Sequence, residues 1–334
     1  WTDTMPQYNK DAKAPLILSC YVCALGAFGA FFRWLQMQVA RDAETGMMNP
    51  SILNVLVPLT ILGAAVLFYL RLKKLCGGVK ALPTEFYTAL KGSSVLCPVI
   101  SWVIGGITAI GGVVTMLNVT LDAQRGLYIV IAAFGILCGL SFPLICAAAR
   151  KRYSPGLTSL FMTLPVVMYS LWLIVCYRAN SNNPNLWVYA VEIIAVCCLI
   201  IAFYYTAGFP FGRAKPRSAA FFCMLGAFLA IVILADSRYM GLQLIILGSA
   251  GMLIMENWLM IQNLHNAEDA PELSPEPAPA AEEAEEPAQD DTADEAEDED
   301  APEPTIEAPA KKPKEDESKL DSEVDEILKE YKKP

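Results

Sequence analysis

Eight runs of about twenty mostly apolar residues follow one another along residues 15–262. At 1.5 Å per residue, a helix of about twenty residues crosses roughly 30 Å of hydrocarbon, so each run is long enough to span a bilayer. In lipid, the backbone polar groups must bond within their own segment, which favours helices for such runs. The sequence therefore predicts an all-α integral membrane protein, a bundle of about eight transmembrane helices at residues 15–36, 51–70, 95–118, 127–147, 156–177, 186–206, 218–236 and 240–262.

The basic residues of the connecting loops predict how this bundle is oriented. Thirteen Lys and Arg of residues 1–266 fall on the side of the N-terminus and five on the opposite side. Cytoplasmic loops carry such an excess, so both termini are predicted to be cytoplasmic, in a multi-pass plasma-membrane protein of the bacterial inner-membrane type. Lys10 and Lys13 also precede the first run as they would in a signal peptide. That run exceeds the ~7–15 residues of a signal core and lacks a small-residue cleavage site, so a retained span is predicted.

The composition changes abruptly after Asn266. Residues 1–266 hold 18 basic and 9 acidic residues, whereas residues 267–334 hold 7 basic and 26 acidic residues. The segment 267–317 is rich in Pro, Ala and Glu and has almost no large apolar residue. It cannot bury enough surface to offset the entropy of ordering, so it is predicted to be a disordered acidic linker. The predicted organisation is a cytoplasmic segment (1–14), a transmembrane domain (15–266), this linker, and a terminal segment (318–334).

The terminal segment carries an amphipathic pattern. Val324, Ile327, Leu328 and Tyr331 occur at spacings i, i+3, i+4 and i+7, which places them on one face of a short helix. One interpretation is a docking helix at the end of a flexible tether that folds into a groove on a cytoplasmic protein. The other is a chance pattern in a Glu- and Lys-rich tail, or a helix that folds back on its own membrane domain.

Apart from Asp236, at the outer end of the seventh predicted span, two acidic residues, Glu192 and Glu256, lie within predicted spans. A charge at mid-bilayer costs ~2.5–3.5 kcal/mol on insertion scales, so such residues are candidates for an intramembrane polar site. Asn257 adjoins Glu256, and Arg33, near the outer end of the first span, is at a suitable height to reach Glu192. Glu192 and Glu256 are expected near opposite faces of the membrane and out of contact.

Two interpretations of Glu192 follow. It either titrates or binds a cation, with Asn118 and Gln243 as polar neighbours at the same depth, or it is the buried ion-pair partner of Arg33 and fixes how the first and sixth spans pack. The structural interpretation is favoured, because one acid with a reachable Arg and no further acids does not form a relay.

The residues for catalysis are missing from the transmembrane segments. The single histidine, His265, lies just beyond the last predicted span, and no His, Asp and Glu residues cluster in the pattern of a metal site. Cys20 and Cys23 have the spacing of a metal or redox pair, but in an apolar helix without a second pair they are expected to be small hydrophobic residues. We therefore predict no enzymatic activity, no cofactor or metal, and no nucleic-acid partner.

The leading functional prediction is a non-enzymatic membrane scaffold or sensor whose cytoplasmic tail recruits a partner protein. The alternative is a small-solute or ion permease that uses Glu192 and helices broken by proline. Gly135 and Gly139 form a G-x-x-x-G pair, which lets helices approach closely within a compact bundle or in a homodimer.

Overall fold

The structure is a computed structural model that describes residues 14–42, 48–76, 82–92, 94, 96–119, 125–151, 154–180 and 186–264. These residues form the helices α1 (Ala14–Val39), α2 (Leu53–Cys76), α3 (Phe86–Ala89), α4 (Leu96–Asn118), α5 (Arg125–Lys151), α6 (Pro155–Asn180), α7 (Leu186–Ala207), α8 (Pro216–Ile233) and α9 (Met240–Gln262). All but α3 are long and apolar enough to cross a membrane, which confirms the predicted fold of eight spans. The acidic linker and the terminal segment with Val324, Ile327, Leu328 and Tyr331 lie outside the described residues.

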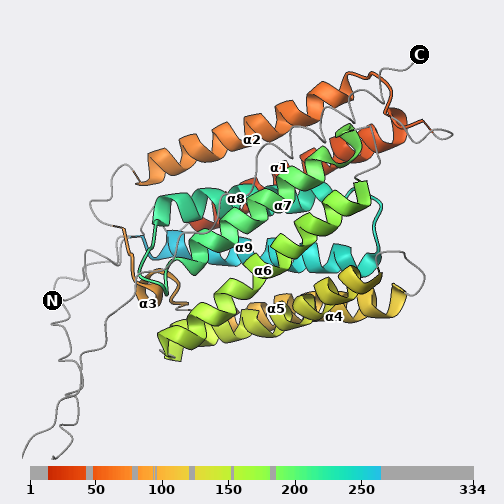
Figure 1. The fold of residues 1–334 in the computed structure, drawn as a ribbon. Helices are drawn as coiled ribbons and strands as arrows, with labels where there is room; N and C mark the ends of the chain where they lie inside the picture. The colour runs from red at the N-terminus through yellow and green to blue at the C-terminus, as the bar shows by residue number, and fades with distance from the viewer. Residues whose placement is uncertain are drawn as a thin grey trace, which may run out of the picture. The chain divides into compact units, whose positions relative to one another are not determined.

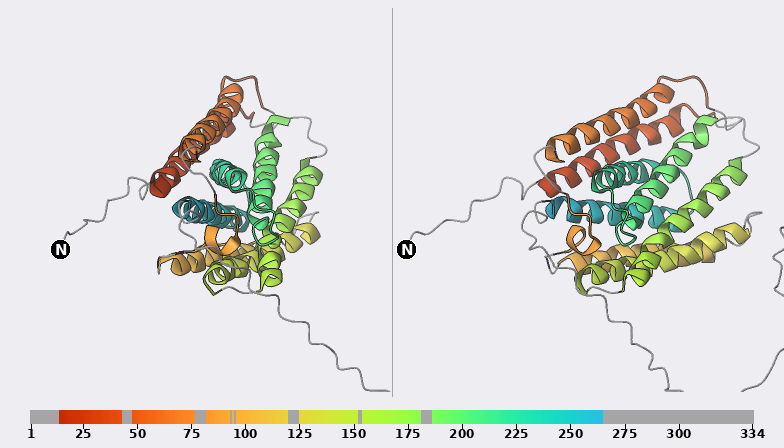
Figure 2. Two further views of the ribbon diagram at one scale, coloured as in Figure 1. Left: turned by 90° about the vertical axis from the view of Figure 1, so that its left-hand side faces the viewer. Right: turned by 60° about the vertical axis from the view of Figure 1, so that its left-hand side comes forward.

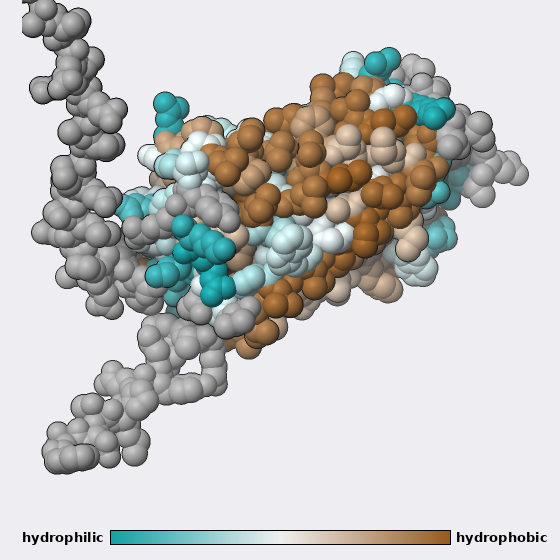
Figure 3. Space-filling view, turned by 90° about the horizontal axis from the view of Figure 1, so that it is seen from below, coloured by the Kyte–Doolittle hydropathy of each residue, from teal (hydrophilic) through white to brown (hydrophobic). Residues whose placement is uncertain are grey.

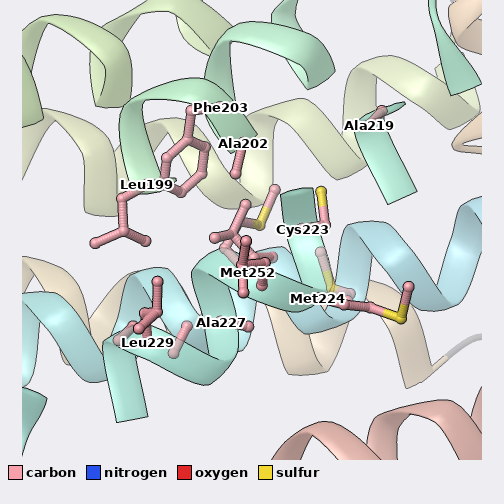
Figure 4. Packing of buried hydrophobic residues seen from close by; sticks show 14 of the residues in the cluster. Leu199, Ala202, Phe203, Ala219, Cys223, Met224, Ala227, Leu229 and Met252 are labelled. Carbon is pink, nitrogen blue, oxygen red and sulfur yellow. The ribbon is translucent and has the colours of Figure 1, made fainter. Parts of the chain in front are cut away.

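Helices α8 and α9 form the centre of the bundle. Helix α8 packs against α1, α2, α7 and α9, and α9 also packs against α4. Figures 1 and 2 show α1 and α2 on one side of this central pair and α4 and α5 on the other, with α6 and α7 covering a third side. Every residue from 223 to 230 of α8 is buried, as expected for a helix that is apolar all round. Figure 4 shows Cys223, Met224 and Ala227 of α8 packed among side chains of α7 and α9.

An apolar belt surrounds the middle of the bundle. Large apolar side chains such as Val55, Trp102 and Tyr204 are 68%, 62% and 63% exposed on its surface. Figure 3 shows one face on which hydrophobic residues cover the middle and hydrophilic residues gather toward the two ends. Exposing these apolar side chains to water costs free energy, whereas exposing them to lipid does not, so this surface is suited to contact with a bilayer.

The two ends of the bundle differ in charge. We call the end that holds α3 and the starts of α4, α6 and α8 the basic end, because nine Lys and Arg of the described residues lie there. They are Arg71, Lys73, Lys74, Lys91, Arg150, Lys151, Arg213, Lys215 and Arg217. Five Arg residues lie at the opposite end, where the connections α1–α2, α4–α5, α6–α7 and α8–α9 are found. The cytoplasmic placement of the basic end stays a prediction from this excess.

Glycines allow the closest helix contact in the bundle. A Cβ atom on Gly105 of α4 would overlap the carbonyl oxygen of Gly139 in α5, and one on Gly135 would lie 2.8 Å from Ile245 of α9. Small residues let transmembrane backbones approach in this way. The Gly135 and Gly139 pair is therefore used for contacts within the chain, and it gives no support to the predicted homodimer.

Helix α3 is attached to the end of α9. Phe86 and Leu90 of this segment are 3% and 2% exposed, so its apolar side chains face the bundle. The Nδ2 atom of Asn263 donates hydrogen bonds to the carbonyl oxygens of Ala89 and Lys91, both at 3.0 Å. These bonds connect the α2–α4 segment to the C-terminal end of the last span.

Candidate functional site

Arg33 of α1 is the most buried charged residue at the end opposite the basic end. Its side chain is 0% exposed. Its Nε atom donates to Oδ1 of Asp236 at 2.7 Å, Nη1 donates to Oε1 of Gln36 at 2.8 Å, and Nη2 donates to the carbonyl oxygen of Val188 at 2.6 Å. A buried guanidinium requires such partners for its fixed set of donors. Arg33 thereby joins α1 to the α8–α9 connection and to the first turn of α7.

A second guanidinium continues this arrangement. Arg238, also in the α8–α9 connection, places Nη2 at 2.9 Å from Oδ2 of Asp236 and at 3.0 Å from Oε2 of Glu192. Its Nη1 atom donates to the carbonyl oxygen of Ile233 at 3.2 Å, at the end of α8, where a positive charge complements the helix dipole. Arg33, Asp236, Arg238 and Glu192 thus form a chain of alternating charge, which we call the charged cluster.

Glu192 of α7 is bonded through both carboxylate oxygens. Oε2 contacts Arg238, and Oε1 accepts from Nε1 of Trp172 at 3.2 Å and from Sγ of Cys176 at 3.1 Å, both on α6. The side chain is 16% exposed. Glu192 is therefore a partly accessible carboxylate that links α7, α6 and the α8–α9 connection.

Polar side chains of α1 and α2 form hydrogen bonds that extend from Arg33 of the charged cluster. Gln36, which accepts from Arg33, donates through Nε2 to Oδ1 of Asn54 at 2.9 Å. Asn54 in turn donates to the carbonyl oxygen of Asn49 at 3.0 Å. Such continuous networks fix the orientation of buried polar groups, so the rotamer of Arg33 is set by α2 as well as by its own ion pair.

The charged cluster borders a cleft of about 790 Å³. The cleft lies at the ends of α6 and α7 on one side and of α5 and α9 on the other, and Figure 1 shows α5 and α6 diverging toward this end of the bundle. Its polar and aromatic lining residues are Arg41, Tyr128, Trp172, Cys176, Asn180, Tyr189, Glu192, Asp236, Ser237, Arg238, Tyr239 and Gln243. We call this feature the polar cleft.

Two of the four residues predicted for an intramembrane polar site, Glu192 and Arg33, belong to the charged cluster. The favoured interpretation paired them directly, but the structure gives each a different partner. Arg33 pairs with Asp236, because α1 packs along α8, whose following connection carries that aspartate. Glu192 pairs with Arg238. The two residues are therefore connected through Asp236 and Arg238.

Asp236 and Arg238 were not predicted as part of the site. Asp236 was expected to end a span over 218–236, whereas α8 ends at Ile233 and the aspartate lies in the connection. The signal that could have identified them is an acid and a base two residues apart in a short connection between two spans. Of the two polar neighbours expected for Glu192, Gln243 lines the cleft and donates to the carbonyl oxygen of Asp236 at 3.1 Å, and Asn118 is not among the lining residues.

Glu256 and Asn257 lie near the basic end, at a different depth from the polar cleft, as expected. Both are 2% exposed, on α9. Thr206 of α7 and Cys223 of α8 lie near the Glu256 carboxyl group. Oε2 of Glu256 and Oδ1 of Asn257 accept no hydrogen bond from the described residues. These two residues therefore form a separate buried polar position.

The polar cleft is lined by paired charges and by uncharged polar and aromatic side chains. Its acids are each matched by a guanidinium, and no group of three or more His, Cys, Asp or Glu side chains suited to a metal ion occurs within the described ranges. Comparison of the chain with protein-family models, with curated proteins and with solved structures finds no match. No function can therefore be transferred to this chain from another protein.

Proposed function

We propose that this polytopic membrane protein is a permease for a small solute, which binds in the polar cleft. The observation that carries the proposal is the charged cluster, whose side chains are at most 16% exposed, at the wall of a cleft of about 790 Å³. Clefts of about 300–1,000 Å³ are typical of small-molecule sites. Charged residues in spans usually face a bundle interior or an aqueous cavity and mark a solute pathway.

The lining favours a small organic zwitterion. Glu192 is the more exposed acid of the cluster, and Arg41 and Arg238, which also line the cleft, offer guanidinium groups to a carboxylate of the ligand. The rings of Tyr128 and Tyr189 also line the cleft, and aromatic faces attract organic cations. A ligand with an ammonium group and a carboxylate can contact both kinds of group without leaving a charge of the cluster unmatched.

Aromatic side chains separate the polar cleft from the basic end. Tyr169 of α6 stacks on Trp172 with ring centroids 5.8 Å apart and on Phe203 of α7 at 6.0 Å, and Phe203 stacks on Phe142 of α5 at 6.3 Å. Phe142, Tyr169 and Phe203 are at most 2% exposed. We call these three rings the aromatic layer. It closes the route that a solute takes from the cleft toward the basic end.

Two prolines provide a means of opening this route. Pro143 follows Phe142 in α5, and Pro165 lies one turn before Tyr169 in α6. Proline removes a backbone hydrogen bond and weakens a helix locally, so both helices can bend beside the aromatic layer. Glu256 lies beyond the layer and supplies a second buried acid near the basic end. The arrangement fits access from one side at a time.

Uptake into proteoliposomes tests this function. The wild-type chain is expected to take up at least one radiolabelled member of a panel of amino acids and betaines. The rate of this uptake is expected to saturate as the solute concentration rises. Glu192→Gln is expected to reduce kcat/KM at least tenfold, because it removes the accessible acid, whereas Glu85→Gln, at the basic end and away from the cleft, leaves uptake unchanged. Uptake equal to that of protein-free vesicles for the whole panel would contradict the proposal.

Recruitment of a cytoplasmic protein by the terminal segment is a second, independent proposal from the sequence. Its observation is the apolar stripe of Val324, Ile327, Leu328 and Tyr331. Affinity purification in mild detergent, with the full chain and with a chain ending at Glu317, tests it. A partner that is lost on truncation supports recruitment, and identical sets of co-purifying proteins contradict it.

A further inference from the structure

A second groove lies at the basic end, between α2 and α8. It has a volume of about 580 Å³, and its lining includes Tyr69, Lys73, Arg217, Ser218, Phe221 and Phe222. The polar cleft lies at the opposite end of the bundle, so the two are separate. We propose that this groove binds an anionic phospholipid of the leaflet at the basic end, and this proposal does not depend on the permease function.

The mouth of the groove is positive and polar. Lys73 lies three residues before the end of α2, and Arg217 and Ser218 lie in the first turn of α8, so all three are at the level expected for lipid headgroups. Lys73 and Arg217 are exposed. Neither forms an ion pair with another residue in the part of the chain that the structure describes. A phosphate can therefore approach both cations without displacing an acid.

The wall of the groove becomes aromatic one turn deeper. Tyr69 precedes Lys73 by four residues, and Phe221 follows Arg217 by four, which at helical rise places both about 6 Å further into the membrane. Phe222 is held in place by Phe221, at a centroid distance of 5.2 Å, and by Tyr205 of α7, at 5.4 Å. A positive mouth above an apolar wall matches an amphiphile with a phosphate head and an acyl chain.

The charge of the whole basic end favours a lipid with net negative charge. Nine described Lys and Arg residues lie there against two described acids, Glu85 and the 2% exposed Glu256. Basic pockets between transmembrane helices bind anionic headgroups, and each cation near the membrane surface adds to the attraction. A zwitterionic lipid gains less from this surface, so the groove should distinguish phosphatidylglycerol from phosphatidylcholine.

The experiment measures lipid binding to the full chain in detergent, by native mass spectrometry and by the melting temperature. Phosphatidylglycerol is expected to bind and to raise the melting temperature, and phosphatidylcholine is not. Lys73→Gln or Arg217→Gln should weaken phosphatidylglycerol binding about fivefold each. The matched controls are Lys74→Gln and Arg150→Gln, which remove cations of the same end that do not line the groove. Because all four side chains are exposed, the variants are expected to melt like the wild type without lipid.

Three results would overturn the proposal. Equal weakening in the control variants would mean a diffuse attraction rather than a site. Equal stabilisation by inorganic phosphate would mean a soluble anion as the occupant. Equal binding of phosphatidylglycerol and phosphatidylcholine would mean that Lys73 and Arg217 do not select a lipid with net negative charge.

Discussion

Replacing Arg33 by Gln should destabilise the bundle more than removing any other single arginine. The side chain is 0% exposed and donates to Asp236, Gln36 and the carbonyl oxygen of Val188 at 2.6–2.8 Å. Removing one partner of a buried ion pair leaves an uncompensated charge and costs about 3–5 kcal/mol. Equilibrium unfolding in detergent and denaturant measures this loss. The control is Arg71→Gln, an exposed residue whose hydrogen bond to Tyr21 is expected to contribute at most about 1 kcal/mol.

Double-mutant cycles test which residue is the partner of Arg33. Arg33→Gln combined with Asp236→Asn should show a coupling energy of about 1–3 kcal/mol, because the two side chains are in contact. Arg33→Gln combined with Glu192→Gln should show a smaller coupling energy, because these two side chains make no direct contact and interact only through Asp236 and Arg238. A larger coupling of Arg33 to Glu192 than to Asp236, or a cost no greater than that of Arg71→Gln, would refute the arrangement of the charged cluster.

Three further substitutions test the packing, each measured by the same unfolding assay. Gly105→Ala should cost about 1–3 kcal/mol, because its Cβ atom overlaps a backbone oxygen of α5, whereas Gly106→Ala, whose Cβ meets nothing within 4 Å, should be neutral or stabilising. Phe203→Ala should cost about 3–5 kcal/mol, because Phe203 is buried in the aromatic layer, whereas Tyr204→Ala, 63% exposed on the apolar belt, should cost far less. Asn263→Ala leaves two carbonyls of the α3 segment without their donor and should cost about 1–3 kcal/mol. Equal costs within either matched pair, or no loss on removing Asn263, would contradict this packing.

The spans could be predicted from the sequence because bilayer thickness fixes their length. The ends were less predictable. Helix α2 continues to Cys76, past the expected residue 70, because long basic side chains such as Lys73 and Lys74 extend a helix into the headgroup region without burying their charge. Helix α8 ends at Ile233, before the expected residue 236, so Asp236 lies in the α8–α9 connection.

The candidate site could be predicted only in part. A charge inside an apolar run is visible in the sequence, so Glu192 and Arg33 could be singled out. Asp236 and Arg238 lie in a connection, where charged residues are ordinary, and only the packing of α1 and α7 beside that connection shows their role. The polar cleft depends on the divergence of helix ends, which no local pattern indicates.

The most direct test of the account is whether the polar cleft holds water within a membrane-embedded bundle. Hydroxyl-radical footprinting of the full chain in proteoliposomes measures this through the oxidation of individual side chains. We expect Met37 and Tyr189, which line the cleft, to be oxidised, and Trp102, which is 62% exposed on the apolar belt, to be spared by the lipid. A bound solute should then protect Tyr189. Oxidation of Trp102 with protection of both cleft residues would contradict the account.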